Sequence, residues 1–146
     1  MPVPQYPLYS ASVALYDGCF KGYYLDESSG WAMDVPGLQK SVDEAKADGK
    51  MVRGLVFINP GNPTGQCLTK DGLQQLVKFA VENNIVLMAD EVYQPNIYQD
   101  EKPFLSARCG LPSCHLPVWP LMSCYTGLAC LSVALSGRCC PCGTEQ

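Results

Sequence analysis

Two short apolar segments with one amphipathic segment between them most constrain the fold. Residues 53–58 (RGLVFI) and 85–89 (IVLMA) are largely apolar runs, as parallel strands buried on both faces tend to be. Thr69 is a candidate helix N-cap, and apolar residues follow it at helical spacing, namely Leu73, Leu76, Val77, Ala80 and Val81. Strand, helix and strand with short links predict a parallel pair with a crossover helix.

The same alternation extends toward the N-terminus. The pattern predicts a short helix over residues 9–16, an aromatic-rich strand over 20–25 and a helix over 35–46. Asp34 is a plausible N-cap of the helix over residues 35–46, and Gly49 follows the end of that helix. We therefore predict an α/β fold, in which crossover helices cover part of a parallel-type sheet.

Charge and cysteine content divide the chain near residue 107. Seven of the nine cysteines follow residue 108, and residues 109–137 contain no Asp, Glu, Lys or Arg. The two isolated cysteines of the front part suit a reducing, intracellular setting. We predict an ordered front part over residues 1–107 and a divergent, Cys-rich tail over 108–146, disordered or read out of frame.

The tail also leaves two alternatives open. Residues 116–135 form an apolar run of the ~20-residue length that spans a bilayer, although Pro117 and Pro120 argue against a membrane helix. The cysteines of residues 139–142 are a candidate zinc site, but the chain has one histidine and no second cysteine pair at regular spacing. We expect no metal and no membrane association. The net charge of −4 argues against nucleic-acid binding.

Each of the two predicted strands is followed by a segment with the character of a ligand site. Residues 59–65 (NPGNPTG) hold two prolines and two glycines, which restrict the backbone and can fix the amide of Asn62 in place. A plain turn is the alternative. Because ligands bind outside the carboxyl ends of parallel strands, the position itself favours a site.

Asp90 ends the second apolar strand, where a carboxylate is costly unless it is paired. A protonated pyridine nitrogen is a suitable partner, and Tyr93 follows three residues later with a hydroxyl group for the same ring. The alternatives are an aspartate that caps the next turn and an ordinary half-buried tyrosine.

Taken in order, these motifs resemble those of the class I/II, fold-type I pyridoxal-phosphate-dependent aminotransferases, and the alanine aminotransferase branch in particular. NPGNPTGQ precedes an apolar strand that ends in DEVYQ, and residues 4–10 (PQYPLYS) and 96–107 (NIYQDEKPFLSA) are similar to that branch. The resemblance covers about residues 2–107. It implies that residues 1–107 are part of the large domain of such an enzyme.

The resemblance implies four roles toward pyridoxal 5′-phosphate. Tyr6 would stack on the ring, and Asn62 and Tyr93 would hydrogen-bond its phenolic oxygen. Asp90 would pair with the pyridine nitrogen. The substrates would be an amino acid and a 2-oxo acid, and the family is homodimeric.

One residue that the family requires has no counterpart. The Schiff-base lysine would fall around residues 122–130, yet no lysine follows Lys102. We therefore identify no catalytic residue and expect this chain alone to transaminate very poorly or not at all. The segment that cradles the phosphate and the arginine that binds the substrate carboxylate would also lie outside the chain.

The predicted parent reaction converts L-alanine and 2-oxoglutarate to pyruvate and L-glutamate. A glutamate:glyoxylate aminotransferase of the same branch, a pyridoxal-phosphate lyase of the same fold and a catalytically inactive fragment are the alternatives. Thr64, Gly65 and Gln66 favour the aminotransferase over the lyase. We expect the natural N-terminus to precede Met1, which leaves cytoplasm and mitochondrion open.

Overall fold

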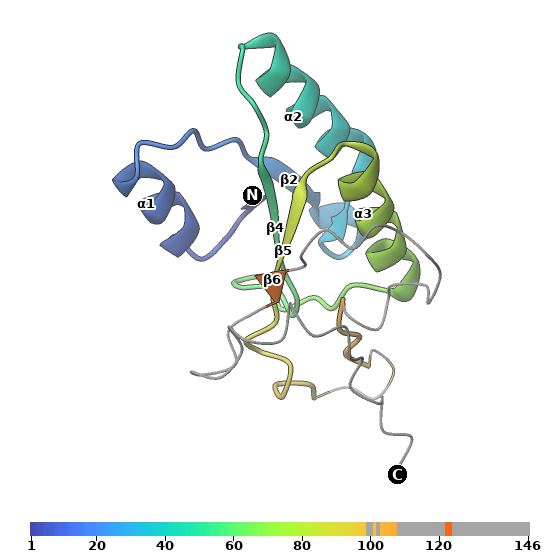
Figure 1. Cartoon of the computed structure of the whole chain (residues 1–146). Coiled ribbons are helices and arrows are strands. Elements are labelled where there is room, and N and C mark those ends of the chain that lie inside the picture. The colour runs from blue at the N-terminus through green and yellow to red at the C-terminus, as the bar shows by residue number, and fades with distance from the viewer. Residues whose placement is uncertain (99–100, 102, 108–121, 124–146) are drawn as a thin grey trace, which may run out of the picture.

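The computed structural model describes residues 1–98, 101, 103–107 and 122–123 (Figure 1). Its strands and helices alternate along the chain, with one short 3-10 helix, η1, after β2. Their bounds are β1 Pro2–Val3, α1 Leu8–Leu15, β2 Tyr23–Asp26, η1 Glu27–Ser29, β3 Ala32–Met33, α2 Val35–Ala47, β4 Gly54–Ile58, α3 Lys70–Glu82, β5 Val86–Asp90 and β6 Met122–Ser123.

The predicted strand–helix–strand unit is confirmed as β4, α3 and β5. The two strands pair in parallel, with Gly54 opposite Val86 and Ile58 opposite Asp90. Thr69 caps α3, because its hydroxyl oxygen accepts the backbone N–H of Gly72 at 3.1 Å. This unit therefore brings the carboxyl ends of both strands to one edge.

The helices over 9–16 and 35–46 are confirmed as α1 and α2, with two corrections nearby. Asp34 occupies the N-cap position of α2, but its side chain makes no capping hydrogen bond. The strand predicted over 20–25 begins at Tyr23, where pairing with β1 begins, and not at Phe20. It joins a separate sheet, parallel to β1 and antiparallel to β3, so the described strands form two sheets.

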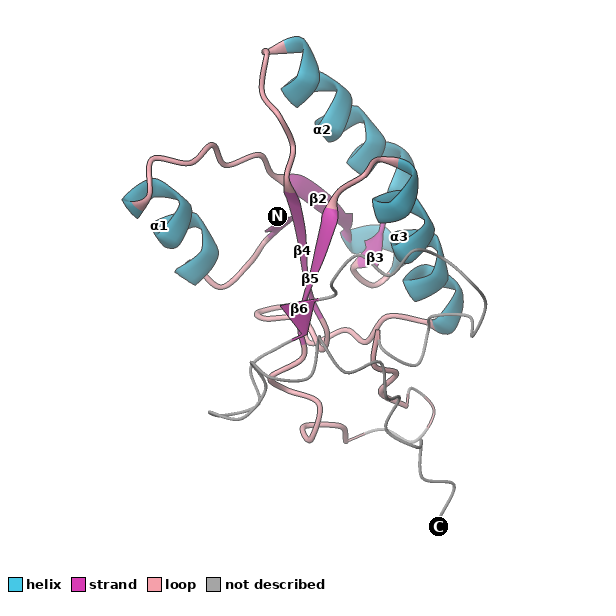
Figure 2. Cartoon of the chain, viewed as in Figure 1, coloured by secondary structure: helices cyan, strands magenta, loops and turns pink. Residues whose placement is uncertain are grey.

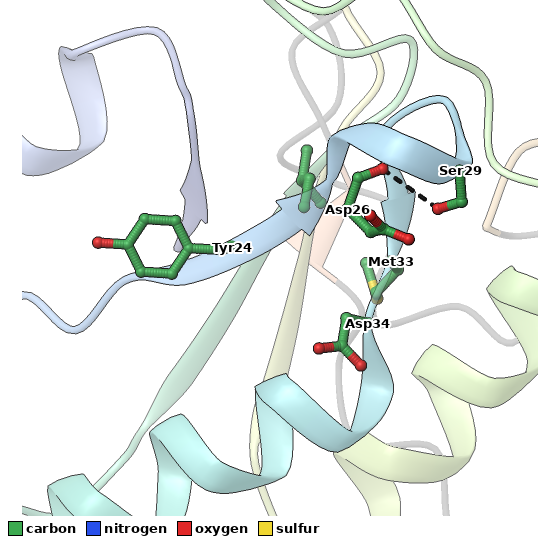
Figure 3. A pocket seen from close by; sticks show the side chains of 6 residues that line it. Tyr24, Asp26, Ser29, Met33 and Asp34 are labelled. Atoms are coloured by element: carbon green, nitrogen blue, oxygen red, sulfur yellow. Dashed lines mark hydrogen bonds between the residues drawn. The ribbon is translucent and has the colours of Figure 1, made fainter.

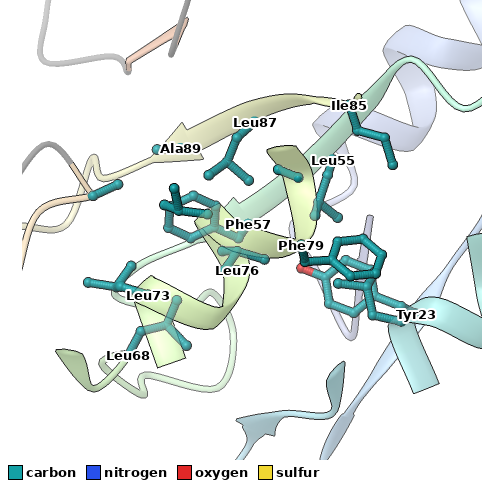
Figure 4. Close-up of a cluster of buried hydrophobic side chains, with 14 of the residues drawn as sticks. Tyr23, Leu55, Phe57, Leu68, Leu73, Leu76, Phe79, Ile85, Leu87 and Ala89 are labelled. Carbon is teal, nitrogen blue, oxygen red and sulfur yellow. The ribbon is translucent and has the colours of Figure 1, made fainter. Parts of the chain in front are cut away.

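A single hydrophobic core joins these sheets to α2 and α3 (Figure 4). Phe57 of β4 and Leu76 of α3 are almost completely inaccessible to solvent. The Tyr23 hydroxyl donates to the Val56 carbonyl at 2.9 Å and thereby ties β2 to β4. Burial raises the pKa of Tyr23, so its phenol stays protonated inside the core.

The faces of β5 differ in what covers them. Leu87 and Ala89 are buried in the core with α3, so Asp90 projects to the opposite face. In the view of Figure 2, α1 lies to the left of β4 and β5, whereas α2 and α3 lie to the right. Among the described residues, no helix is long and apolar enough to cross a membrane.

Candidate cofactor site

The two segments predicted as a site begin side by side. Ile58 and Asp90 are opposite each other in the β4–β5 pair, and the Asn59 N–H donates to the Asp90 carbonyl at 2.8 Å. The ladder thus continues one step beyond the strands. As a result, the loop of residues 59–65 and the turn after Asp90 share one edge of the sheet.

The loop after β4 closes on itself. The Gly61 N–H donates to the Gln66 carbonyl at 2.9 Å, and the Gly65 N–H donates to the Gly61 carbonyl at 2.8 Å. Gly65 has a φ of +71°, which favours glycine. The Gln66 side chain accepts the Thr64 hydroxyl and lies so close to Gly61 that a Cβ there would collide with it. These contacts hold Asn62 at the tip of the loop.

The loop tip and the turn after β5 meet through their side chains. The Asn62 Nδ2 group donates to the Tyr93 hydroxyl oxygen at 3.3 Å. Because the hydroxyl oxygen is the acceptor, the tyrosine proton is left to donate elsewhere, and the amide has a second N–H. Tyr93 is 39% exposed, so both donors can reach an oxygen atom of a ligand.

Asp90 is held on both carboxylate oxygens. The Tyr9 hydroxyl donates to Oδ2 at 2.7 Å, and the Val92 N–H donates to Oδ1 at 3.3 Å. Within the described part of the chain, no lysine or arginine forms an ion pair with this half-buried carboxylate. Since an ionised carboxylate offers about four acceptor positions, it can accept a further donor.

The sequence did not reveal the contact between Tyr9 and Asp90. The sequence predicts a helix that begins at Tyr9, and Tyr9 lies in the first turn of α1. Its partner is 81 positions away, and no local pattern indicates it. The position of Tyr9 three residues after Tyr6, in the PQYPLYS segment, is the one available signal.

Tyr6 stands apart from the other three predicted residues. It precedes Pro7, the N-cap of α1, and is 53% exposed. Among the described residues, no hydrogen bond joins it to Asn62, Asp90 or Tyr93. Its stacking role therefore stays a prediction.

Two buried polar residues behind the site were also not foreseen. Asn59 has no exposed surface; its Oδ1 accepts the Leu68 N–H at 2.9 Å and its Nδ2 donates to the Leu105 carbonyl at 3.0 Å. Glu91 accepts the Ser106 hydroxyl at 2.8 Å and the Ala107 N–H at 2.7 Å. Together these bonds attach residues 105–107 to the segments that follow β4 and β5.

A separate hollow lies at β2 and β3, lined by Tyr24, Leu25, Asp26, Ser29, Met33 and Asp34 (Figure 3). Asp26 is engaged locally, since it accepts the Ser28 hydroxyl at 2.7 Å and its carbonyl accepts the Ser29 hydroxyl at 3.1 Å. Hydrogen bonds from both serines lower the pKa of Asp26. None of the four predicted site residues lines this hollow.

The predictions for the tail fall mostly outside the described residues. The candidate zinc cysteines 139–142 lie there, as does nearly all of the apolar run 116–135. No cluster of three or more potential metal ligands occurs among the residues that the structure describes. The one part of the tail that the structure describes is β6, which pairs in parallel with β5 through Met88–Met122 and Ala89–Ser123.

Comparison with known proteins defines the class of the chain. The family described as aminotransferase class I and II matches residues 1–126, so the chain belongs to that family. The match runs past the boundary placed at residue 107 and includes β6. The divergent character of residues 108–146 stays a prediction.

Within the family, the chain is similar to two kinds of enzyme. It is 54% identical to glutamate–glyoxylate aminotransferase 1 of Arabidopsis thaliana over 108 residues, which cover 74% of this chain and 22% of that protein. It is 53% identical to alanine aminotransferase 2 of Panicum miliaceum over 105 residues, which cover 72% of this chain and 22% of that protein. The chain thus spans about a fifth of the curated relatives it matches.

Solved structures agree with this class. An alanine aminotransferase from Pyrococcus furiosus superposes with a TM-score of 0.65 at 27% identity, over 77% of this chain and 26% of that one. An aminotransferase from Escherichia coli gives 0.64 at 35% identity, over 75% of this chain and 25% of that one. The mixed α/β fold therefore matches aminotransferase structures over about a quarter of their length.

Proposed function

We propose that this chain carries the ring-binding part of an aminotransferase large domain and holds pyridoxal 5′-phosphate at the strand-end edge. In this proposal, β4, α3 and β5 belong to the parallel sheet of a fold-type I enzyme. The observation that carries it is the meeting of the two loops, in which Asn62 contacts Tyr93 at 3.3 Å next to the end of β5.

The donor and acceptor set fits the cofactor ring. Asn62 and Tyr93 supply two neighbouring hydrogen-bond donors, which suit an anionic phenolic oxygen. Asp90 supplies an acceptor with no cationic partner among the described residues, which suits a protonated ring nitrogen. Both features follow paired strands, since Asn62 lies in the loop after β4, and Asp90 ends β5 with Tyr93 three residues later.

When bound, pyridoxal phosphate supplies an electron sink for the substrate carbon that bears the amino group. The Asp90 carboxylate would keep the ring nitrogen protonated by stabilising its positive charge. Asn62 and the Tyr93 hydroxyl would favour the ionised form of the phenolic oxygen by donating hydrogen bonds to it. Tyr6 would stack on one face of the ring, as the family resemblance implies.

We identify no residue in this chain for the covalent step. Lys21 pairs with Glu44 at 2.8 Å and Lys78 with Glu82 at 3.8 Å, and among the described residues no lysine forms an ion pair with Asp90. Because no lysine follows Lys102, the general base that would move a proton at the substrate carbon is missing. We therefore propose that this chain binds the cofactor without sustaining turnover alone.

The parent activity is proposed as amino transfer between L-alanine and 2-oxoglutarate. Glutamate with glyoxylate is the second candidate, because identities of 54% and 53% to the two kinds of relative do not separate them. We also propose an intracellular site of action; two similar alanine aminotransferases of Arabidopsis thaliana are named mitochondrial. Homodimer formation is likewise a proposal from the family.

The decisive test is binding of pyridoxamine 5′-phosphate, which lacks the aldehyde and therefore does not react with surface lysines. Saturable binding to the full chain is expected by calorimetry, and Asp90→Asn should weaken it by about tenfold or more. Glu101→Gln, a carboxylate change outside the site, is the matched control. Absence of binding by the native chain would reject the proposal.

Turnover separates the enzyme from the inactive fragment. The chain loaded with pyridoxal phosphate would be assayed with L-alanine and 2-oxoglutarate, and with L-glutamate and glyoxylate. We expect binding without measurable product for either pair. Steady production of pyruvate or glycine would contradict the inactive-fragment reading and would also identify the substrate pair.

A further inference from the structure

The Tyr9 hydroxyl joins α1 to the carboxylate at the end of β5. Its hydrogen bond to Asp90 Oδ2 is 2.7 Å long and links positions 81 residues apart. We propose that Tyr9 is a positioning residue, which orients Asp90 toward a ring nitrogen and at the same time holds α1 beside the site. The inference rests on the proposed function, which supplies the ring.

Core packing does not fix the position of α1. None of its residues is buried, and Leu15 is 76% exposed. Its N-cap, Pro7, provides no side-chain cap. A short helix with so little packing depends on specific contacts for its place. The bond from Tyr9 to the end of a core strand is such a contact.

The same bond bears on Tyr6. Tyr6 lies immediately before the N-cap of α1 and three residues before Tyr9. Since Tyr9 is in the first turn of the helix, anchoring it restricts where the preceding loop can lie. Tyr9 thus links two predicted roles, the stacking of Tyr6 and the charge of Asp90.

The geometry at Asp90 shows how Tyr9 can orient the Asp90 carboxylate without neutralising its negative charge. Tyr9 donates to Oδ2, and the Val92 N–H donates to Oδ1 at 3.3 Å, so rotation of the carboxylate is opposed at both oxygens. Both donors are uncharged at neutral pH, which leaves the negative charge available to a cation. The remaining lone pairs can then accept an N–H from a ring.

The first experiment needs no cofactor. Deuterium exchange on the millisecond scale would be followed in the α1 amides of the full chain, its Tyr9→Phe variant and its Tyr16→Phe variant. Tyr16 is the matched control, because it is 82% exposed and also loses one hydroxyl group. We expect exchange in α1 to be at least about threefold faster in Tyr9→Phe and unchanged in Tyr16→Phe.

The second experiment asks whether Tyr9 acts through the ring nitrogen. Binding of pyridoxamine 5′-phosphate would be compared with binding of its deaza analogue, in which C–H replaces that nitrogen. Tyr9→Phe should weaken binding of the natural compound by about threefold to tenfold more than it weakens binding of the analogue, because only the natural compound has the ring nitrogen that Asp90 would contact. A purely structural role of Tyr9 would weaken both equally.

Each result decides a separate point. Unchanged exchange in Tyr9→Phe would overturn the tether, whether or not any ligand binds. Equal weakening for both ligands, or no weakening, would overturn the positioning of Asp90 while the proposed function stands. If the native chain binds neither compound, the proposed function fails and the role of Tyr9 toward a ring nitrogen fails with it.

Discussion

Helices α1 and α3 stand in opposite relations to the core. α3 buries one face, with Leu73, Leu76, Val77, Phe79 and Ala80 inaccessible or nearly so. α1 carries no charged residue, yet none of its residues is buried. Apolar content therefore does not decide burial here. The arrangement of apolar residues does, because α3 has one apolar stripe that fits against β4 and β5.

This difference separates stability from binding. Residues enclosed by β4, α3 and β5 form the core of the unit, whereas the proposed ligand contacts lie in the strand-end loops and near α1. Paired substitutions of one residue type in the two settings test that separation.

The largest expected effect on stability comes from shortening a leucine in the core. Leu76→Ala, at a position with no exposed surface, should lower the free energy of unfolding by about 2–5 kcal/mol through lost burial and a cavity. Leu15→Ala, the same change at 76% exposure, should change it by less than about 0.5 kcal/mol. Urea denaturation of both variants checks this. Similar losses would show that α1 contributes to the core after all.

Two asparagines of one loop provide the next comparison. Asn59→Ala leaves the Leu68 N–H and the Leu105 carbonyl without their partner and should cost about 1–3 kcal/mol of stability. Asn62→Ala should cost less than about 1 kcal/mol and instead weaken binding of pyridoxamine phosphate. Denaturation and calorimetry on the same samples measure both. The reverse pattern would mean that the inner asparagine is the ligand contact.

The link between the two sheets predicts an alkaline effect. The pKa of Tyr23 is raised in the folded state, so its contribution is fully present below the unfolded pKa of about 10 and is lost as the pH rises above it. Tyr23→Phe should lower the free energy of unfolding by about 0.5–1.5 kcal/mol near pH 8. Near pH 11 the stability of this variant should fall less than that of the native chain, because the variant has no phenol to ionise. Unfolding curves at both pH values test this. An unchanged decline would exclude Tyr23 as a source.

The smallest effect concerns the exposed pair of Lys21 and Glu44. The hydrogen bond and charge of Lys21 lower the pKa of Glu44 in the folded state. The pair therefore stabilises the fold above the unfolded pKa of a glutamate, about 4.3, and this stabilisation is lost as the pH falls through the lower folded pKa of Glu44. Glu44→Gln should remove this dependence, with a smaller change than Tyr23→Phe, and added salt should diminish it further. An effect that survives high salt would argue against a screened surface pair.

Much of the β4–α3–β5 unit can be predicted from short stretches of sequence. The two apolar runs, the helical spacing after Thr69 and the strand-end position of Asn62 and Asp90 each reflect the few residues around them. Chain positions alone did not reveal that β2 pairs with β1 and β3, since Tyr23 is placed by its partner strands and by the Val56 carbonyl.

The site divides in the same way. The sequence predicts that Asn62 and Tyr93 act together, and they are in contact. It does not indicate the three supporting residues, Tyr9, Asn59 and Glu91, because each bonds to a segment outside its own element. Hydrogen bonds of this kind depend on how distant segments pack, and no spacing in the chain encodes them.

The family, the strand–helix–strand unit and the two motifs that follow its strands can be predicted from the sequence, because hydrophobic periodicity and turn chemistry act over a few residues. The fold is needed to show that the unburied helix α1 reaches Asp90, and that Asn59 and Glu91 bind residues 105–107. Those contacts join positions separated by long stretches of chain, and only the packing of the sheet brings them within bonding distance.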